Sequence, residues 1–316
     1  MDPLYSIIYP TSRKIPHLDW FLDSLQKQAS DEELRRVQLI VVDRFSQENG
    51  RYNWFVQHKG LDKFHSVVRT PVKPCTISGK YRLTSKDWFA ASAFRNTGIL
   101  LADADHLVFV DDLSIVTPGW WDSVKKSREQ QKVYFGTYAK HRKMIVKDGE
   151  IVSSDPWPGG ADTRLQISAE TRVCTGSWMF GCSVAVPTEA MLQINGFDED
   201  ADTMGGEDYA AGMMLERRGW ECVFCVEMKT IESDEDHEVG EVLPRLIKEH
   251  PDPNQKDFSH IYLEWIKSGQ RDTAAFYNNR GLSLRDARKQ VRKTRTLPEC
   301  SIPEHDWRDG QPFSEM

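Results

Sequence analysis

Short continuous apolar runs mark the first third of the chain. They occur at residues 4–9, 37–43 and 106–110. Continuous rather than alternating hydrophobicity is typical of parallel strands that are covered on both faces. Between the first two runs, apolar side chains recur at the i, i+3, i+4 and i+7 spacing of one helix face, namely at Leu18, Phe21, Leu22 and Leu25. The chain therefore opens with a predicted β-α-β unit.

The pattern continues with a helical segment over 86–102, directly before the strand at 106–110. This alternation predicts an α/β fold with a mostly parallel central sheet flanked by helices. The polar stretch 139–172 is broken by DPWPGG and predicts a long loop over a cleft. Residues 204–220 predict a helix that begins after two glycines, and the chain beyond about 240 is charged and helical.

Composition narrows the class of protein. The 316 residues, 39% of them hydrophobic, suffice for one large domain with a tail or for two domains that share an interface. The formal charge of −7 gives no overall basic field. No apolar run reaches the roughly 18 to 20 residues of a membrane span, and the first residues lack the pattern of a secretory signal. We therefore expect a cytoplasmic protein, with peripheral membrane contact as a further possibility.

Two of the six cysteines have C-x-x-C spacing, Cys222 and Cys225. They lie in a predicted strand, where positions three apart face opposite sides of the sheet. Buried thiols are the favoured interpretation, and redox or zinc chemistry is the alternative.

Acidic side chains follow two of the predicted strands. Asp43 ends the strand at 37–43, and Asp111 and Asp112 follow the strand at 106–110. Ligands of parallel sheets bind beyond the carboxyl ends of the strands. Adjacent carboxylates there can hold a hard divalent cation, although a solvated turn would use the same residues.

The segment RNTGILLADADHLVFVDDLSIVTPGWW, 95–121, resembles the family-2 glycosyltransferases of GT-A fold. Their pattern is approximately A-R-N-x-G, an apolar strand, an Asp-rich motif and P-G-W. The matching positions are Arg95, Asn96, Gly98, Asp111, Asp112, Pro118, Gly119 and Trp120. Further likeness covers the first strand and helix, the second strand with Asp43, and the segment 176–220 with its G-F-D-E and E-D motifs. The resemblance extends over roughly residues 4 to 225.

This resemblance implies a Rossmann-like GT-A domain over 1–240, with a nucleotide-sugar-binding half (1–112) and an acceptor-binding half (113–240). A helical and irregular C-terminal extension, 241–316, would follow. The two halves would share one continuous sheet.

The implied reaction is inverting transfer of a hexosyl or pentosyl group from a nucleotide sugar, expected to be a UDP-sugar, to an acceptor hydroxyl. The acceptor could be a glycan, a lipid-linked molecule, a protein or modified DNA. By resemblance, Asp208 would be the catalytic base and Glu207 would organise the site. Carboxylates in a first helical turn are also favoured by the helix dipole, which is the structural alternative.

The resemblance also implies a donor site, with Mn²⁺ or Mg²⁺ as cofactor. Its residues would be Pro10, Thr11, Arg13, Asp43, Arg44, Arg95, Asp111 and Asp112. Two positions depart from the family pattern, because Arg44 stands where an acidic residue is usual and Leu113 stands where an aspartate ligates the metal. The metal ligands would then be Asp112 and His237, the latter being alternatively a surface histidine.

If His237 binds no metal, a metal-free site could depend on cationic side chains instead. The candidates are Arg95, Arg44, Lys80 and Arg82. Asp43, assigned to the nucleobase or ribose, could alternatively cap a turn.

The acceptor side would use Trp157, Trp178, Gly205 and Gly206. Trp157 lies in a Pro/Gly-flanked segment, Trp178 suits either the acceptor or the core, and Trp120 and Trp121 are expected in the core. The basic run 285–295 is typical of a solvated helix face, with an anionic partner such as a membrane surface or nucleic acid as the alternative.

Two other functions fit part of the pattern. A nucleotidyltransferase could use the same paired aspartates, but it should carry a glycine-rich basic loop after the first strand, and PTSRKIPH at 10–17 has no glycine. A non-catalytic nucleotide- or carbohydrate-binding protein is the other alternative.

Overall fold

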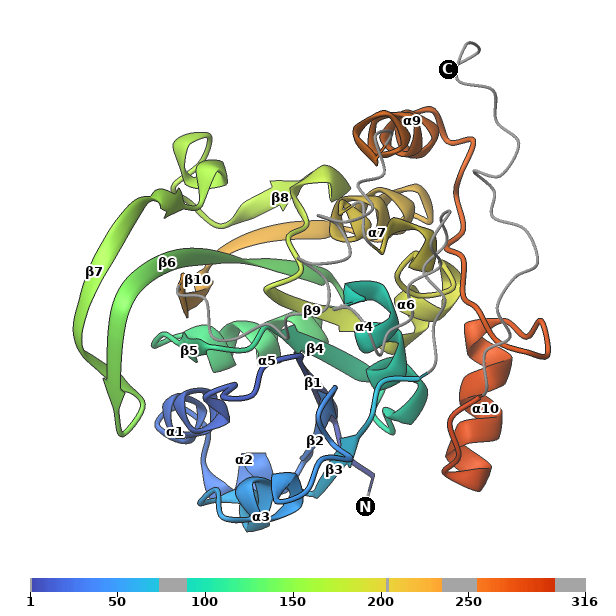
Figure 1. Cartoon of the computed structure of the whole chain (residues 1–316). Coiled ribbons are helices and arrows are strands. Elements are labelled where there is room, and N and C mark those ends of the chain that lie inside the picture. Colours follow the sequence, from blue (N-terminus) through green and yellow to red (C-terminus); the bar gives the residue numbers. More distant parts are fainter. Residues whose placement is uncertain (1, 74–89, 203–204, 235–254, 299–316) are drawn as a thin grey trace.

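The computed structural model describes residues 2–73, 90–202, 205–234 and 255–298 (Figure 1). The described residues form one ten-stranded sheet with the strand order β3-β2-β1-β4-β9-β6-β10-β5, to which β7 is added at β6 and β8 at β10. The sheet is continuous across both halves of the chain, as predicted.

The N-terminal half holds the parallel part of the sheet. Its strands are β1 (Tyr5–Thr11), β2 (Val37–Asp43), β3 (Ser66–Thr70) and β4 (His106–Val110). Neighbours among these four run parallel, and every residue of β1, β2 and β4 is buried, as continuous hydrophobicity predicted. Its helical segments are α1 (Leu18–Gln26), α2 (Asp31–Leu34), α3 (Arg51–Val56), η1 (Leu61–Lys63) and α4 (Ala91–Leu101).

The C-terminal half makes the sheet mixed. Its strands are β5 (Ser114–Val116), β6 (Val133–Lys147), β7 (Glu150–Ala161), β8 (Arg172–Cys174), β9 (Ser183–Pro187) and β10 (Cys222–Ser233). Strand β9 is antiparallel to both β4 and β6, whereas β10 is parallel to β6. The predicted parallel arrangement therefore applies to the first half, and β9 inserts against it.

Helices of the second half cover both faces of the sheet. They are α5 (Trp120–Gln130), η2 (Thr163–Gln166), η3 (Gly176–Trp178), α6 (Thr188–Gln193), η4 (Glu199–Ala201) and α7 (Glu207–Arg217). Trp120 and Trp121 at the start of α5 are fully buried, which confirms the prediction that they belong to the core.

The prediction of a long loop over 139–172 is wrong. Strands β6 and β7 form a long hairpin that curls away from the sheet (Figure 1). Its turn contains Asp148 and Gly149, both with positive φ, the backbone that an Asp-Gly hairpin turn requires. The prolines of DPWPGG are tolerated because β7 pairs only with β6 and is an edge strand. The Asp-Gly dipeptide was the sequence signal that the loop prediction overlooked.

Two hydrophobic clusters pack on opposite faces of the sheet, and the C-x-x-C pair is divided between them. Cys222 belongs to the cluster with Phe94 and Met214, and Cys225 to the cluster with Phe21. Both thiols are free and buried, as favoured from the sequence, and burial raises the pKa of Cys225. Among the described residues, no group of three or more His, Cys, Asp or Glu side chains is arranged to hold a metal ion.

The C-terminal part of the chain contains α9 (Gln255–Ser268) and α10 (Leu284–Thr294). The connection between them packs on the G-F-D-E segment: Arg271 forms ion pairs with Asp198 and Asp200, and the Ala275 amide donates to Asp198 at 3.2 Å. Within the described ranges, no helix has the length and apolar character needed to cross a membrane.

Candidate functional site

The carboxyl ends of β1 and β4 bring predicted donor residues together. Pro10 and Thr11 end β1, and the Thr11 hydroxyl donates to Asp112 Oδ2 at 2.6 Å. Arg13 donates from Nε to Asp112 Oδ1 at 3.2 Å. One carboxylate therefore joins two segments that are about a hundred residues apart in the sequence.

The contact with Asp112 satisfies only part of the hydrogen-bonding capacity of Arg13. The Nη1 group of Arg13 is buried and has no hydrogen-bond partner among the described residues. Burial raises the pKa of Asp112 to about 6, although Arg13 and the Thr11 hydroxyl oppose the rise. A buried donor without an acceptor costs about 1 to 3 kcal/mol, so this position favours an incoming anion.

The backbone conformation and burial of Leu113 give it a structural role at the position where the sequence pattern led us to expect an aspartate. Its backbone is left-handed, with φ of 57°, and its side chain is buried. Its amide donates to the carbonyl of Pro16 at 3.2 Å, and its carbonyl accepts from the amide of Ser233 at 3.0 Å. The third position of the motif therefore serves packing and backbone pairing.

Asp43 adopts the alternative arrangement of a strand-end carboxylate. It is fully buried and pairs with Arg51 through both oxygens, at 2.7 and 3.0 Å, while the Phe45 amide donates to Oδ1 at 3.0 Å. Arg51 also donates to the carbonyl of Arg13 at 3.0 Å. Asp43 thus positions the segment that carries Arg13, and a direct contact with nucleotide stays a prediction. The guanidinium of Arg44 lies 5.6 Å from the centre of the Phe45 ring.

Arg95 joins the two acidic motifs. It donates from Nη2 to Asp111 at 3.0 Å and from Nη1 to Glu207 at 2.9 Å. Burial alone would lower the pKa of Arg95, but the nearby carboxylates of Asp111, Glu207 and Asp208 outweigh it and raise this pKa. The guanidinium lies so close to Gly181 that a Cβ at this glycine would be 2.4 Å from Nη2. Arg95, predicted from the sequence as a donor-site residue, therefore holds two carboxylates together, and its contact with the donor stays a prediction.

The remaining residues of the A-R-N-x-G motif have packing roles. Asn96 donates to the Phe197 carbonyl at 2.8 Å and accepts from the Phe197 amide at 2.8 Å, which fixes the G-F-D-E segment. A Cβ at Gly98 would lie 2.4 Å from the side chain of Ile8 in β1. The spacing of the motif thus places Arg95 on the carboxylates, Asn96 on the G-F-D-E segment and Gly98 against the sheet.

Glu207 and Asp208 begin α7, after two glycines with φ of 78° and 85°, Gly205 and Gly206. These values explain the glycines by backbone geometry, and their contact with an acceptor stays a prediction. Asp208 accepts from the Gly181 amide at 3.0 Å through Oδ2. Burial, and next the Asp208 charge, raise the pKa of Glu207 against the effect of Arg95.

The two candidate acceptor tryptophans occupy different surroundings. Trp157 lies on β7, half-buried, with the Arg142 guanidinium 4.6 Å from its ring centre. Trp178 lies in η3, half-buried, in edge-to-face contact with Phe224 at 5.1 Å, and its carbonyl accepts from Arg164. Trp178 is thus held against the hydrophobic core, whereas Trp157 is part of the projecting hairpin.

Sequence reasoning missed Glu232, a buried acid near Asp111. The Thr230 hydroxyl donates to it at 3.1 Å. Burial, and next the Asp111 charge, raise the pKa of Glu232 to about 7. The sequence directed attention to a ligand after this strand, His237, which lies outside the described residues, as do Lys80 and Arg82.

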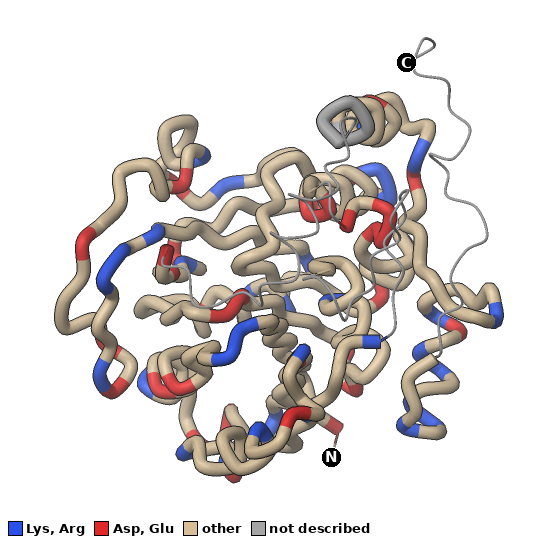
Figure 2. Tube along the Cα trace, viewed as in Figure 1, with Lys and Arg blue, Asp and Glu red and all other residues tan. Residues whose placement is uncertain are grey.

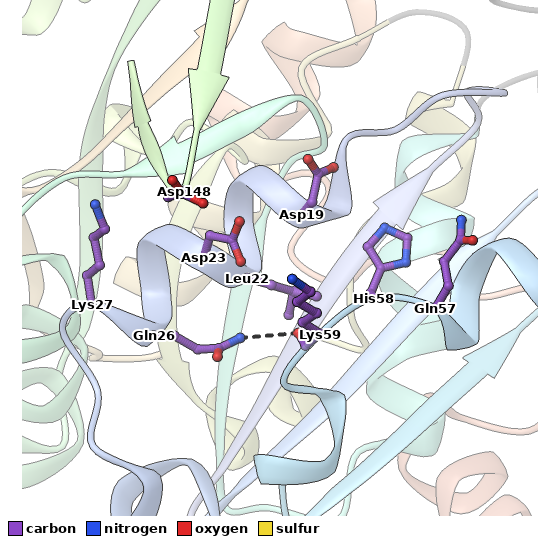
Figure 3. A pocket seen from close by; sticks show the side chains of 9 residues that line it. All are labelled: Asp19, Leu22, Asp23, Gln26, Lys27, Gln57, His58, Lys59 and Asp148. Atoms are coloured by element: carbon purple, nitrogen blue, oxygen red, sulfur yellow. Dashed lines mark hydrogen bonds between the residues drawn. The ribbon is translucent and has the colours of Figure 1, made fainter. Parts of the chain in front are cut away.

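A surface pocket of about 460 Å³ lies beside α1, and none of the predicted site residues lines it (Figure 3). Asp23 of α1 lies near Asp148 of the hairpin turn, and Asp19, His58 and Lys59 also line the pocket (Figure 3). Burial, and next the charges of Asp19 and Asp148, raise the pKa of Asp23. This pocket is separate from the carboxylates described above.

No protein-family model and no curated protein matches the sequence. Among solved structures, the fold is similar to that of GalNAc-T7 in a complex with UDP, GalNAc and Mn²⁺, with a TM-score of 0.56 and 14% sequence identity. That similarity covers 84% of this chain and 50% of GalNAc-T7. Residues 1–349 of S. aureus TarS, in complex with UDP-GlcNAc, align with a TM-score of 0.49 and 14% identity, over 76% of this chain and 60% of that one.

The chain thus spans 50% of the length of GalNAc-T7 and 60% of the length of the TarS fragment. The likeness to GalNAc-T7 supports the architecture expected from the ordered motifs. The chain has the GT-A fold of nucleotide-sugar glycosyltransferases.

Proposed function

We propose that this protein transfers a sugar from a UDP-sugar to an acceptor hydroxyl with inversion at the anomeric carbon. The observation that carries the proposal is the convergence of two acidic motifs on Arg95, at the edge of the sheet where Arg13 has an N–H group with no partner among the described residues. The GT-A fold, and the UDP bound in the similar GalNAc-T7 structure, support a nucleotide donor.

Arg13 is suited to the diphosphate of the donor. Its Nη1 group needs an acceptor, and its Nε group is fixed by Asp112. Two opposite unit charges 4 Å apart attract by about 4 kcal/mol at an effective dielectric constant near 20, and about 1.36 kcal/mol corresponds to a tenfold rate. A cation held at the leaving phosphate would therefore accelerate departure substantially.

Asp208 is suited to act as the base. Its carboxylate accepts from backbone amides and forms no ion pair among the described residues, whereas Glu207 is held by Arg95. In the proposed step, the acceptor hydroxyl gives its proton to Asp208 while its oxygen bonds to the anomeric carbon. The bond from that carbon to the diphosphate oxygen breaks, and its electron pair leaves with the diphosphate.

Of the two proposed metal ligands, the described residue Asp112 has the chemistry that suits a divalent cation. Asp112 is a hard oxygen donor whose pKa stays raised because burial outweighs Arg13, so an additional cation would stabilise its charge. Mn²⁺ or Mg²⁺ would be held by Asp112 and His237, with phosphate oxygens completing the shell. When bound, the cation would supply positive charge at the leaving diphosphate.

For the acceptor, the projecting β6–β7 hairpin offers the half-buried ring of Trp157. Aromatic faces bind the apolar faces of sugar rings, so a glycan or another glycosylated acceptor would suit a contact with Trp157.

The direct test is donor hydrolysis, because it requires no acceptor. The chain is incubated with UDP-hexoses, a UDP-pentose and sugars on other nucleoside diphosphates, with and without Mn²⁺, and nucleoside diphosphate release is measured. We expect release from a UDP-sugar, reduced by Asp112→Asn and unchanged by the surface control Lys126→Ala. Absence of release from every donor, together with absence of UDP binding by calorimetry, would contradict the proposal, whereas binding without release would favour a binding protein.

A further inference from the structure

Helix α10 has one apolar and one basic face. Its buried side chains pack into the core beside α4, and they are Leu284, Ala287 and Val291. Six basic residues gather on and just after the helix (Figure 2), namely Arg285, Arg288, Lys289, Arg292, Lys293 and Arg295. In a chain with a formal charge of −7, this is a local basic surface.

The carboxylates near α10 do not balance this charge. Arg285 pairs with Glu189, Arg292 and Arg295 share Asp103, and Lys289 pairs with Asp286. Among the described residues, three carboxylates thus form ion pairs with four of the six cations. In the part of the chain that the structure describes, neither Arg288 nor Lys293 forms an ion pair.

Among the described residues, four of the cations line a hollow of about 400 Å³: Arg288, Lys289, Arg292 and Lys293. Arg288 donates to the carbonyl of Ala102 at 2.8 Å, and its Nε group is buried without a partner among the described residues. Burial, and next the charge of Arg292, lower the pKa of Arg288 to about 10. The cations therefore repel one another, and an anion in the hollow would stabilise them.

We propose that α10 is a docking surface for the phosphate backbone of double-stranded nucleic acid. Basic side chains recur at i and i+4 in two rows, Arg285/Lys289/Lys293 and Arg288/Arg292, with about 6 Å between successive members. The helix is about 16 Å long, and one strand of duplex DNA presents a phosphate about every 3.4 Å of its axis. One face of α10 can thus follow several successive phosphates.

The composition of α10 favours a duplex over two other anionic surfaces. A helix that lies on a membrane inserts apolar side chains, but the apolar residues of α10 are already buried in the core. Single strands are held by stacking on aromatic rings, and α10 contains none. Contacts would be made to phosphates alone, so binding would be independent of base sequence.

This surface is independent of the proposed transfer reaction. Arg288 and Arg295 contact Ala102 and Asp103, beyond the C-terminal end of α4, whereas Arg95 lies in the first half of that helix. Loss of binding at α10 would therefore leave donor hydrolysis unchanged.

The test is fluorescence anisotropy of a labelled 20-base-pair duplex titrated with the full chain at several salt concentrations. Four phosphate contacts predict a slope of about −3.6 in a plot of log affinity against log salt. For Lys289→Glu/Lys293→Glu we expect at least about tenfold weaker binding and a slope near −1.8. The control Lys126→Glu/Lys147→Glu changes the net charge equally at exposed positions elsewhere and should keep the affinity within about twofold.

The proposal would be overturned by equal weakening by the control pair, by tighter binding of a single strand than of the duplex, or by binding to phosphatidylglycerol vesicles but not to the duplex. Circular dichroism of each variant monitors folding. The pair Lys289→Gln/Lys293→Gln, which removes charge without reversing it, should give an intermediate loss, and wild-type affinity for that pair would equally contradict the docking surface.

Discussion

Arg95 and Glu207, which are 112 residues apart in the sequence, form an ion pair of 2.9 Å. The same guanidinium holds Asp111 at 3.0 Å, so the Asp-rich motif and the E-D motif are fixed relative to each other by one side chain. Lysine at this position would keep the charge but lose the planar fork that reaches both carboxylates.

We therefore expect Arg95→Lys to lower the kcat of donor hydrolysis about a hundredfold with little change in KM, because misplacement of catalytic groups by about 1 Å can cost that much.

Arg95→Ala should lower the free energy of unfolding by about 3 kcal/mol, since it leaves partly buried carboxylates unpaired. Urea unfolding measures this loss. Arg128, which pairs with Asp105 at an exposed position, is the matched control, and Arg128→Ala should cost less than about 1 kcal/mol. Equal losses for the two arginines would show that the double contact of Arg95 has no special role.

Asp208→Asn should abolish most transfer while keeping the geometry. The amide oxygen can still accept from the Gly181 amide, but it cannot take a proton. We expect kcat to fall about 10²- to 10⁴-fold, with UDP affinity unchanged within about twofold by calorimetry. Glu207→Gln should instead lower stability, because it weakens the pair with Arg95. Full transfer by Asp208→Asn would rule out its role as base.

Arg13→Gln should weaken UDP binding about 10- to 100-fold, the range expected for loss of a hydrogen bond to a charged group. Uridine, which has no phosphate, should bind the variant and the wild type equally. This comparison, made by calorimetry, separates a diphosphate contact from a general disturbance of the site. A parallel loss of uridine affinity would assign Arg13 a structural role through Asp112.

Glu232 should make stability depend on pH. Burial raises its pKa from 4.5 to about 7, so the folded state binds its proton more tightly than the unfolded state does. Its contribution is therefore fully favourable below pH 4.5 and is lost as the pH rises through about 7. At pH 8 we expect Glu232→Gln to be more stable than the wild type by up to about 3 kcal/mol, with the difference vanishing near pH 4.

Chemical unfolding of both proteins at pH 4, 6 and 8 gives this difference directly. Glu221→Gln, at an exposed surface position, is the control and should show no such trend. A wild type that stays the more stable protein at pH 8 would show that the charged form of Glu232 is compensated in the fold.

The sequence by itself determined the elements and the order of the motifs. Continuous apolar runs predicted β1, β2 and β4, and helical spacing predicted α1, because local hydrophobic patterning reflects which faces are covered. It also placed Asp111 and Asp112 at a strand end and Trp120 and Trp121 in the core. The hairpin over 133–161 was missed although Asp148 and Gly149 carry a hairpin signal.

Only the tertiary structure decided which residues of the candidate site interact with one another. Arg51 gave no sequence signal, yet it pairs with Asp43 and donates to the carbonyl of Arg13. Burial, and next the charge of Asp111, raise the pKa of Glu232, which lies on a strand more than a hundred residues away in the sequence. Arg95 was predicted to bind the donor, and the structure adds that it holds two carboxylates. The physical reason is that hydrophobic periodicity depends on neighbours along the chain, whereas the partner of a buried charge depends on which distant segments the sheet brings within hydrogen-bonding distance.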